Sequence, residues 1–168
     1  YCEVQELDVD TLSHESGPAQ LEINFNHGDP LELADQVFLF KRTVRQAALK
    51  HDIYATFMAK PCIDQPGNGL HIHVSLCDKN GKNLFGEAGG DVLLHQAIAG
   101  LQMTMAESLG FCAPNFSSFR RYTPRNFVPI NAHWGENNRS VALRVPHSDA
   151  KARRIEHRAA CADAARAG

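Results

Sequence analysis

Side chains that suit a hard divalent cation occur at four places in the sequence: Glu15, Glu22, His71 and Glu156. Carboxylate-rich ligand sets fit Mg²⁺ or Mn²⁺ better than zinc, which usually takes more histidine or cysteine. Taken singly, an exposed glutamate is more often a surface charge, and a histidine on a strand is more often structural. We therefore expect a metal site only if the four side chains converge at one cleft.

Arginines provide what a phosphate-binding site beside such a cation would need. Planar guanidinium groups bind phosphate and carboxylate oxygens bidentately and keep their charge. Phosphoryl transfer depends on positioning and charge neutralisation rather than on a protein nucleophile. From spacing alone, these residues fit a metal-phosphate site about as well as they fit solvated surface charge. The candidates are Arg121, Arg139, Arg144, Arg154 and Arg158.

Three short segments with period-two alternation would position these groups. Residues 19–25, 70–76 and 153–158 each place polar side chains on one face and apolar ones on the other. The pattern predicts an α+β fold with a largely antiparallel sheet, a polar active-site face and helices on the opposite face, although periodicity leaves parallel pairing open. The polar faces are Gln20-Glu22-Asn24, His71-His73-Ser75 and Arg154-Glu156-Arg158.

The remaining pattern supplies the covering layer and its connections. Helical periodicity runs from after Pro30 to about Asp52 and again over residues 92–109. Enrichment in β-branched and aromatic residues predicts a strand over 53–57, and a further strand is expected over 140–145. Residues 115–131, with their prolines and arginines, are expected to be irregular.

Composition excludes several classes of protein. The 168 residues carry 17 Lys and Arg against 19 Asp and Glu, so the basic excess that nucleic-acid binding requires is missing. No apolar run approaches the ~20 residues that span a bilayer. The five cysteines form no CxxC spacing, which favours a reducing compartment. We expect a cytoplasmic protein of one domain, cut from something longer because it starts at Tyr1 without Met.

Four segments resemble motifs of the glutamine synthetase superfamily, in the same chain order. Residues 14–22 resemble the segment with two metal-binding glutamates, and residues 67–76 resemble the G-x-G-x-H-x-H-x-S-L region. Residues 138–146 are similar to the N-R-S...R-x-P segment, and residues 154–158 to R-I-E-x-R. The likeness covers nearly the whole sequence, including residues 57–61, where the family commonly has proline in place of alanine.

The resemblance implies a role for each matched residue. Glu15 and Glu22 would hold the Mg²⁺ or Mn²⁺ nearer the amine, and His71 with Glu156 would hold the one bridging the ATP phosphates. The other roles fall into two sets, with Arg121 and Arg139 taken as catalytic. The nucleotide would be bound by His73, Ser75, Arg139, Arg144 and Arg154, and the substrate glutamate by Gly67, Arg121 and Arg158.

The implied reaction is an ATP-dependent ligation. The glutamate γ-carboxylate would be phosphorylated to an acyl phosphate, which ammonia or an alkyl amine such as a polyamine attacks to form an amide. The resemblance also implies a homo-oligomeric full-length protein. Residues 1–168 would be the central part of the catalytic domain, lacking the N-terminal domain, the Glu-x-Glu strand and the C-terminal segments, so this piece alone is expected to be inactive.

One departure bears on the substrate. Glutamine synthetases carry a Gly-Tyr-Glu-Ala-Pro loop whose glutamate handles the ammonium proton, whereas Phe127 takes that place within residues 124–129 here. An aromatic ring cannot take a proton but can line a pocket for an alkyl chain. This resembles the γ-glutamylpolyamine synthetase branch. Two alternatives remain: a non-catalytic relative kept for assembly or regulation, and the weaker reading of a guanidino-kinase-like phosphotransferase.

Overall fold

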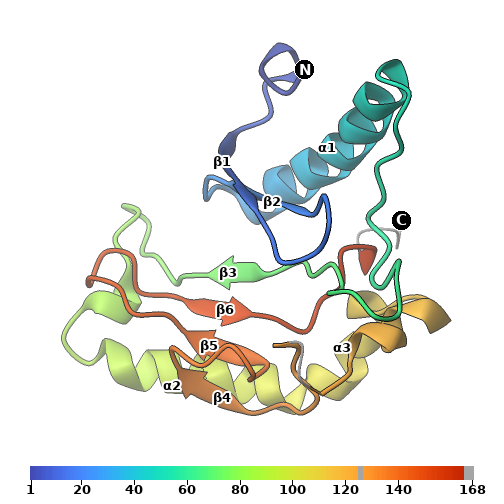
Figure 1. The fold of residues 1–168 in the computed structure, drawn as a ribbon. Coiled ribbons are helices and arrows are strands. Elements are labelled where there is room, and N and C mark those ends of the chain that lie inside the picture. The colour runs from blue at the N-terminus through green and yellow to red at the C-terminus, as the bar shows by residue number, and fades with distance from the viewer. Residues whose placement is uncertain (125–126, 165–168) are drawn as a thin grey trace.

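A four-stranded sheet forms the centre of the molecule, which we describe from a computed structural model over residues 1–124 and 127–164 (Figure 1). Its strand order is β3-β6-β5-β4, and both neighbours of β6 run antiparallel to it while β4 and β5 are parallel. The strands are short: β3 is Ile72–Val74, β4 is Trp134–Glu136, β5 is Leu143–Val145 and β6 is Ile155–His157.

The register of this sheet separates a polar face from an apolar one. Glu156 on β6 pairs with His73 on one side and with Arg144 on the other, so three polar side chains cross the sheet in one row. Ile155 and Leu143 point to the opposite face and are fully buried. There they pack on α2, Gly90–Met103, through a core of Phe85, Leu94, Ile98, Met105, Ala142, Leu143, Val145, Ile155 and Ala159.

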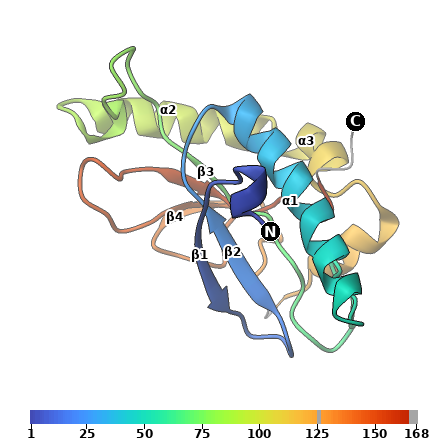
Figure 2. The same ribbon diagram turned by 90° about the horizontal axis from the view of Figure 1, so that it is seen from above.

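A second, two-stranded sheet lies above the central sheet in Figure 1. It is an antiparallel hairpin of β1, Val9–His14, and β2, Leu21–Phe25. Helix α1, Pro30–Lys50, runs beside it, as the view from above shows (Figure 2). The helix begins where Asp29 caps its first backbone N–H groups. The hairpin and α1 lie above the central sheet in Figure 1, whereas α2 runs behind β4 and β5.

Short helical elements complete the described chain. Helix α3 is Met105–Cys112, and it is separated from α2 at Thr104, whose hydroxyl donates to the Gly100 carbonyl oxygen at 3.1 Å. Serine and threonine bonds of this kind compete with the helical pattern and bend helices. Three 3₁₀ turns are present: η1 is Glu3–Gln5, η2 is Leu84–Gly86 and η3 is Phe116–Arg121.

The α+β class with a largely antiparallel sheet is confirmed, and several details of the sequence prediction are corrected. Residues 53–57 form no strand, because no strand in the described part of the chain pairs with them and most of their side chains face solvent. The helix expected over 92–109 is two helices. The three polar segments lie on two sheets rather than one, because Gln20, Glu22 and Asn24 belong to the hairpin and its loop.

The segment that follows β6, residues 158–162, joins several parts of the molecule. It is buried throughout, and its backbone is hydrogen-bonded to chain segments that are far apart in sequence. Its backbone partners in distant parts of the chain are Ala142, Leu70, Cys112 and Asn68. Within the described ranges, no helix is both long enough and apolar enough to cross a membrane.

Candidate metal and nucleotide site

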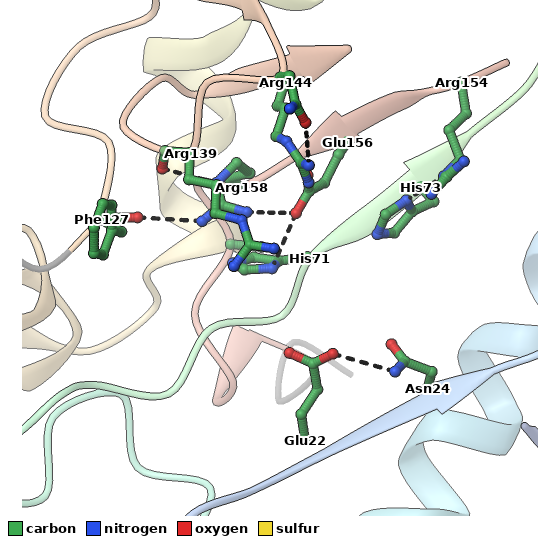
Figure 3. Close-up of polar contacts among 12 residues, drawn as sticks. Glu22, Asn24, His71, His73, Phe127, Arg139, Arg144, Arg154, Glu156 and Arg158 are labelled. Carbon is green, nitrogen blue, oxygen red and sulfur yellow. Dashed lines mark hydrogen bonds and ion pairs between the residues drawn. The ribbon is translucent and has the colours of Figure 1, made fainter. Parts of the chain in front are cut away.

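Glu156 is the centre of a buried ion cluster on the polar face of the sheet (Figure 3). Its carboxylate accepts a hydrogen bond from Arg144 Nη1 at 2.7 Å and another from Arg158 Nη1, and His71 Nδ1 lies 3.2 Å from Oε1. Burial alone would raise the pKa of Glu156. The hydrogen bonds from His71 and Arg144 and the charge of Arg158 outweigh burial and hold the pKa well below its usual value.

Arg158 is fixed by the loops around it as well as by Glu156. Its Nε donates to the backbone oxygen of Arg139, and its Nη2 donates to the backbone oxygen of Phe127, both at 3.2 Å. Arg144 similarly reaches Asn137 Oδ1 at 2.7 Å. The two guanidinium groups therefore tie the irregular stretches before β4 and β5 to the polar face.

Glu15 and Glu22 form a second acidic pair, on the hairpin. Their carboxyl groups hydrogen-bond to each other, and this contact, followed by burial, raises the pKa of Glu15. Burial would also raise the pKa of Glu22, but hydrogen bonds from Glu15 and from Asn24, the latter at 3.2 Å, lower it overall. The two carboxyl groups therefore interact directly and shift each other's pKa in opposite directions. When two carboxylates share a site, their repulsion raises the pKa of one of them.

The Glu15–Glu22 pair is on the hairpin, whereas Glu156 and its arginines are on the central sheet (Figure 3). His71 is close enough for its charge to act on both Glu15 and Glu22, and it contacts Glu156 directly. The four predicted ligands thus lie on one side of the molecule as two neighbouring pairs. In residues 1–124 and 127–164, however, no three His, Cys, Asp or Glu side chains form a group that could hold a metal ion.

The Glu15–Glu22 pair suits a hard cation better than Glu156 does. The carboxylate oxygens of Glu15 and Glu22 would serve as ligands for such a cation, with the His71 ring nearby. Both oxygens of Glu156, by contrast, are held by arginines. Its role as a metal ligand stays a prediction, and it requires that one of those arginines release it.

The residues expected at the nucleotide lie along the same polar face. Arg154 Nε donates to His73 Nδ1 at 2.9 Å, so that nitrogen carries no proton and the ring is neutral. Burial lowers the pKa of His73, with Glu156 opposing the shift and the charge of Arg154 adding to it. Ser75 Oγ donates to the Arg153 carbonyl oxygen at 3.3 Å. Arg139 is exposed and near enough to Glu22 for its charge to be felt there.

Comparison with known proteins identifies the family. The family model described as "Glutamine synthetase, catalytic domain" matches residues 1–166. The chain belongs to the glutamine synthetase catalytic-domain family. The "Gamma-glutamylputrescine synthetase PuuA" of Escherichia coli (strain K12) is 43% identical over 166 residues, which is 97% of this chain and 35% of that protein.

One further relative and one solved structure are similar over most of the chain. The "Glutamine synthetase" of Pyrococcus horikoshii is 40% identical over 153 residues, covering 90% of this chain and 34% of that protein. A solved structure described as "GmaS/ADP complex-Conformation 1" superimposes with a TM-score of 0.82 at 28% identity, covering 96% of this chain and 39% of that one. The chain spans about a third of the length of the curated relatives it matches.

Arg121, expected from the glutamine synthetase resemblance to bind the substrate, is buried beneath the segment after β6. Its Nη1 donates to the carbonyl oxygens of Ala159 and Ala160, both at 3.1 Å, and its Nη2 donates to that of Arg158 at 3.2 Å. A Cβ added at Gly67 would stand 3.1 Å from Arg121 Cγ. Arg121 therefore supports the chain around the site in this structure, and its contact with substrate stays a prediction.

Sequence reasoning gave no role to two residues that the structure places at the centre of the site. Gln20 lies on the polar face predicted for Glu22 and Asn24, and Asn68 lies within the 67–76 segment, but neither is among the predicted site residues. Their side chains are hydrogen-bonded to each other at 2.7 Å, across 48 positions of sequence. The glutamine's place two residues before Glu22 was the available signal, because alternation puts the two on one face.

Proposed function

We propose that the intact protein is an ATP-dependent ligase that joins the γ-carboxylate of glutamate to ammonia or an amine. The observation that carries the proposal is the position of His71, which contacts Glu156 directly and is near enough to the Glu15–Glu22 pair for its charge to act on both carboxyls. Paired carboxylates beside arginines are the groups that phosphoryl transfer needs. Family membership favours the same reaction.

The reaction would run in two steps. An oxygen of the glutamate γ-carboxylate attacks the γ-phosphorus of ATP, which forms γ-glutamyl phosphate and releases ADP. The amine nitrogen then attacks the acyl carbon, loses a proton and expels phosphate, which leaves the amide. A bound Mg²⁺ or Mn²⁺ would neutralise charge on the transferring phosphoryl group.

The protein's own groups would bind and orient the reactants. Arg139, Arg144 and Arg154 would hold phosphate oxygens, because guanidinium forks match their geometry. His73 and Ser75 would lie beside the nucleotide, and the ADP complex named for the similar solved structure supports a nucleotide site in this fold. Gly67, Arg121 and Arg158 would bind glutamate once the loops carrying them are arranged around it.

An alkyl amine is the acceptor that the loop before Ile130 favours. Phe127 is 71% exposed and its backbone oxygen accepts from Arg158, so its ring stands at the edge of the ion cluster (Figure 3). An apolar ring there can line the path of an alkyl chain. The relative with 43% identity, named for γ-glutamylputrescine, supports an amine acceptor, although glutamine synthetases at 40% identity are nearly as similar.

The test is amine-dependent ADP release by the intact protein with glutamate and Mg²⁺. Ammonia, a linear monoamine and putrescine are supplied separately, and amide formation is measured by mass spectrometry. We expect one amide per ADP, with an alkyl amine preferred to ammonia. Turnover with none of the three acceptors would refute the ligase. A parallel titration with Mg²⁺ and ATP then identifies a non-catalytic relative if neither binds.

A further inference from the structure

Gln20 joins the hairpin that carries the acid pair to the loop that leads into β3. Its Nε2 donates to the backbone oxygen of Gly67 at 3.0 Å and to Asn68 Oδ1 at 2.7 Å. Its Oε1 accepts from the backbone N–H of Gly17 at 2.9 Å. Both hydrogens and the oxygen of the amide are therefore used, and the side chain is fixed in one orientation.

Gln20 also determines the shape of its own loop, which connects β1 and β2. Gln20 also closes the loop through its backbone, because its N–H donates to the Gly17 oxygen and its oxygen accepts from the Glu15 N–H, both at 3.0 Å. A Cβ added at Gly17 would stand 2.8 Å from Gln20 Oε1. The loop begins at Glu15 and leads into β2, which carries Glu22. Its shape therefore affects the separation of the two carboxyl groups.

Asn68, the side-chain partner of Gln20, holds the loop that leads to His71 and β3. Asn68 Nδ2 donates to the Met58 oxygen at 2.7 Å, and the Asn68 backbone is bonded to Ala59 and Ala162. The loop around Asn68 is therefore held by these bonds as well as by its bond to Gln20. Gly69, the next residue, lies so close to His71 that an added Cβ would be 3.0 Å from Nε2. The position of this loop thus sets the position of the imidazole.

We propose that Gln20 is a positioning residue that sets the spacing between the Glu15–Glu22 pair and His71, and so the spacing of the cation ligands on the two loops. The amide touches neither carboxylate nor the imidazole, and it acts by fixing the two backbone loops that carry them. The inference rests on the proposed function, which supplies the cation. Residues that orient metal ligands from outside usually contribute about 10- to 100-fold to metal affinity or activity.

The experiment compares Gln20→Met with Gln36→Met in the intact protein. Methionine keeps the length of the side chain but removes the amide, so in the first variant the loop-to-loop bonds are lost. Gln36 is the matched control, because its Oε1 accepts from the Asp8 N–H at 3.0 Å and so ties the same hairpin to α1, away from the acid pair. Mn²⁺ binding is measured by calorimetry without nucleotide, together with KM for glutamate, kcat and the thermal midpoint.

We expect Gln20→Met to weaken Mn²⁺ binding by at least about tenfold and to raise KM for glutamate. Gln36→Met is expected to change Mn²⁺ affinity by less than about twofold. Equal Mn²⁺ affinity in Gln20→Met and wild type, with only a lower thermal midpoint, would show that the residue is merely structural.

A second variant keeps the test decisive if methionine disrupts folding. Gln20→Glu preserves the shape and the acceptor for Gly17 but lacks both donors, so it should show the same loss of Mn²⁺ affinity. If neither variant folds, Gln20 is a folding residue and the proposal is overturned. A wild-type protein that binds Mn²⁺ but releases no ADP would refute the ligase while leaving the role of Gln20 measurable.

Discussion

Arg144 and Glu156 lie opposite each other on adjacent antiparallel strands and are joined at 2.7 Å. Neighbouring strands bring directly paired residues on one face within a few ångströms, so the register itself creates this ion pair. Glu156 is only 3% exposed. A charge so deeply buried is stable only when its counter-ions are present.

Removing the charge of Glu156 is therefore expected to destabilise the fold. Glu156→Gln keeps the shape but leaves Arg158 buried without its counter-ion, at a cost of about 3–5 kcal/mol in the free energy of unfolding. Chemical denaturation of the intact protein measures it. Asp91→Asn, which breaks an ion pair of Arg153 on the surface, is the control and should change little. Equal stability of the two variants would contradict the prediction.

The same cluster predicts a dependence of stability on pH. The pKa of Glu156 is lower in the folded protein than in the unfolded chain, where a glutamate titrates near about 4.3. Its contribution is thus complete above that pH and is lost as the pH falls toward the folded pKa. Denaturation between neutral pH and pH ~3 should show wild type and Glu156→Gln converging in acid. A constant difference would show that the carboxylate charge is not involved.

A methyl group at Gly67 should be poorly tolerated. The added Cβ would stand 2.5 Å from the Ala59 backbone oxygen, which cannot move without disturbing the Asn68 loop. We expect Gly67→Ala to lower the free energy of unfolding by about 1–3 kcal/mol. Gly100→Ala is the matched control, since that site in α2 is open and alanine favours helix by about 0.5–1 kcal/mol. Opposite shifts in the thermal midpoint are expected.

Substitution of Arg121 tests how much its contacts with backbone oxygens contribute to stability. Lysine keeps the charge but cannot reach the three backbone oxygens that the guanidinium group binds. Arg121→Lys is therefore expected to cost about 3 kcal/mol in the free energy of unfolding, because buried acceptors are left unpaired. Arg120→Lys, at the exposed neighbouring position, serves as the control. If both variants unfold at the same denaturant concentration, the carbonyl contacts contribute nothing to stability.

Phe127 tests the identity of the acceptor. Phe127→Glu restores an acidic side chain that can take a proton from ammonium, and it removes the apolar ring. The ratio of kcat/KM for ammonia to kcat/KM for a linear amine should rise by about tenfold, a difference of about 1.4 kcal/mol. Phe116→Glu, at another exposed phenylalanine, should leave the ratio unchanged. An unchanged ratio in both variants would remove Phe127 from the acceptor site.

Much of the polar face could be predicted from alternation. Period-two spacing places His73 and Glu156 on one face, and antiparallel pairing then makes them neighbours. Alternation could not show that Glu22 belongs to a different sheet, because strand order is not encoded in periodicity. It also missed β1, whose mostly exposed residues lack an apolar face to reveal it.

Other differences arise from tertiary contacts that local pattern does not contain. Residues 53–57 have strand-forming side chains, yet β propensity has no effect without a neighbouring strand. Arg121 has the residue type of a substrate ligand, but only the fold shows that carbonyl oxygens surround it. The link between Gln20 and Asn68 is likewise invisible in sequence, because it joins two loops through side-chain amides.

The backbone bonds of residues 158–162 have a consequence for the order of folding. Apart from Ala164 in the adjoining turn, its backbone partners Ala142, Leu70, Cys112 and Asn68 precede the segment in the chain and come from widely separated regions. Contacts between distant positions form slowly because long loops must close first. We therefore expect residues 158–162 to form their full set of bonds late in folding, because those bonds require four distant regions of the chain to be in place.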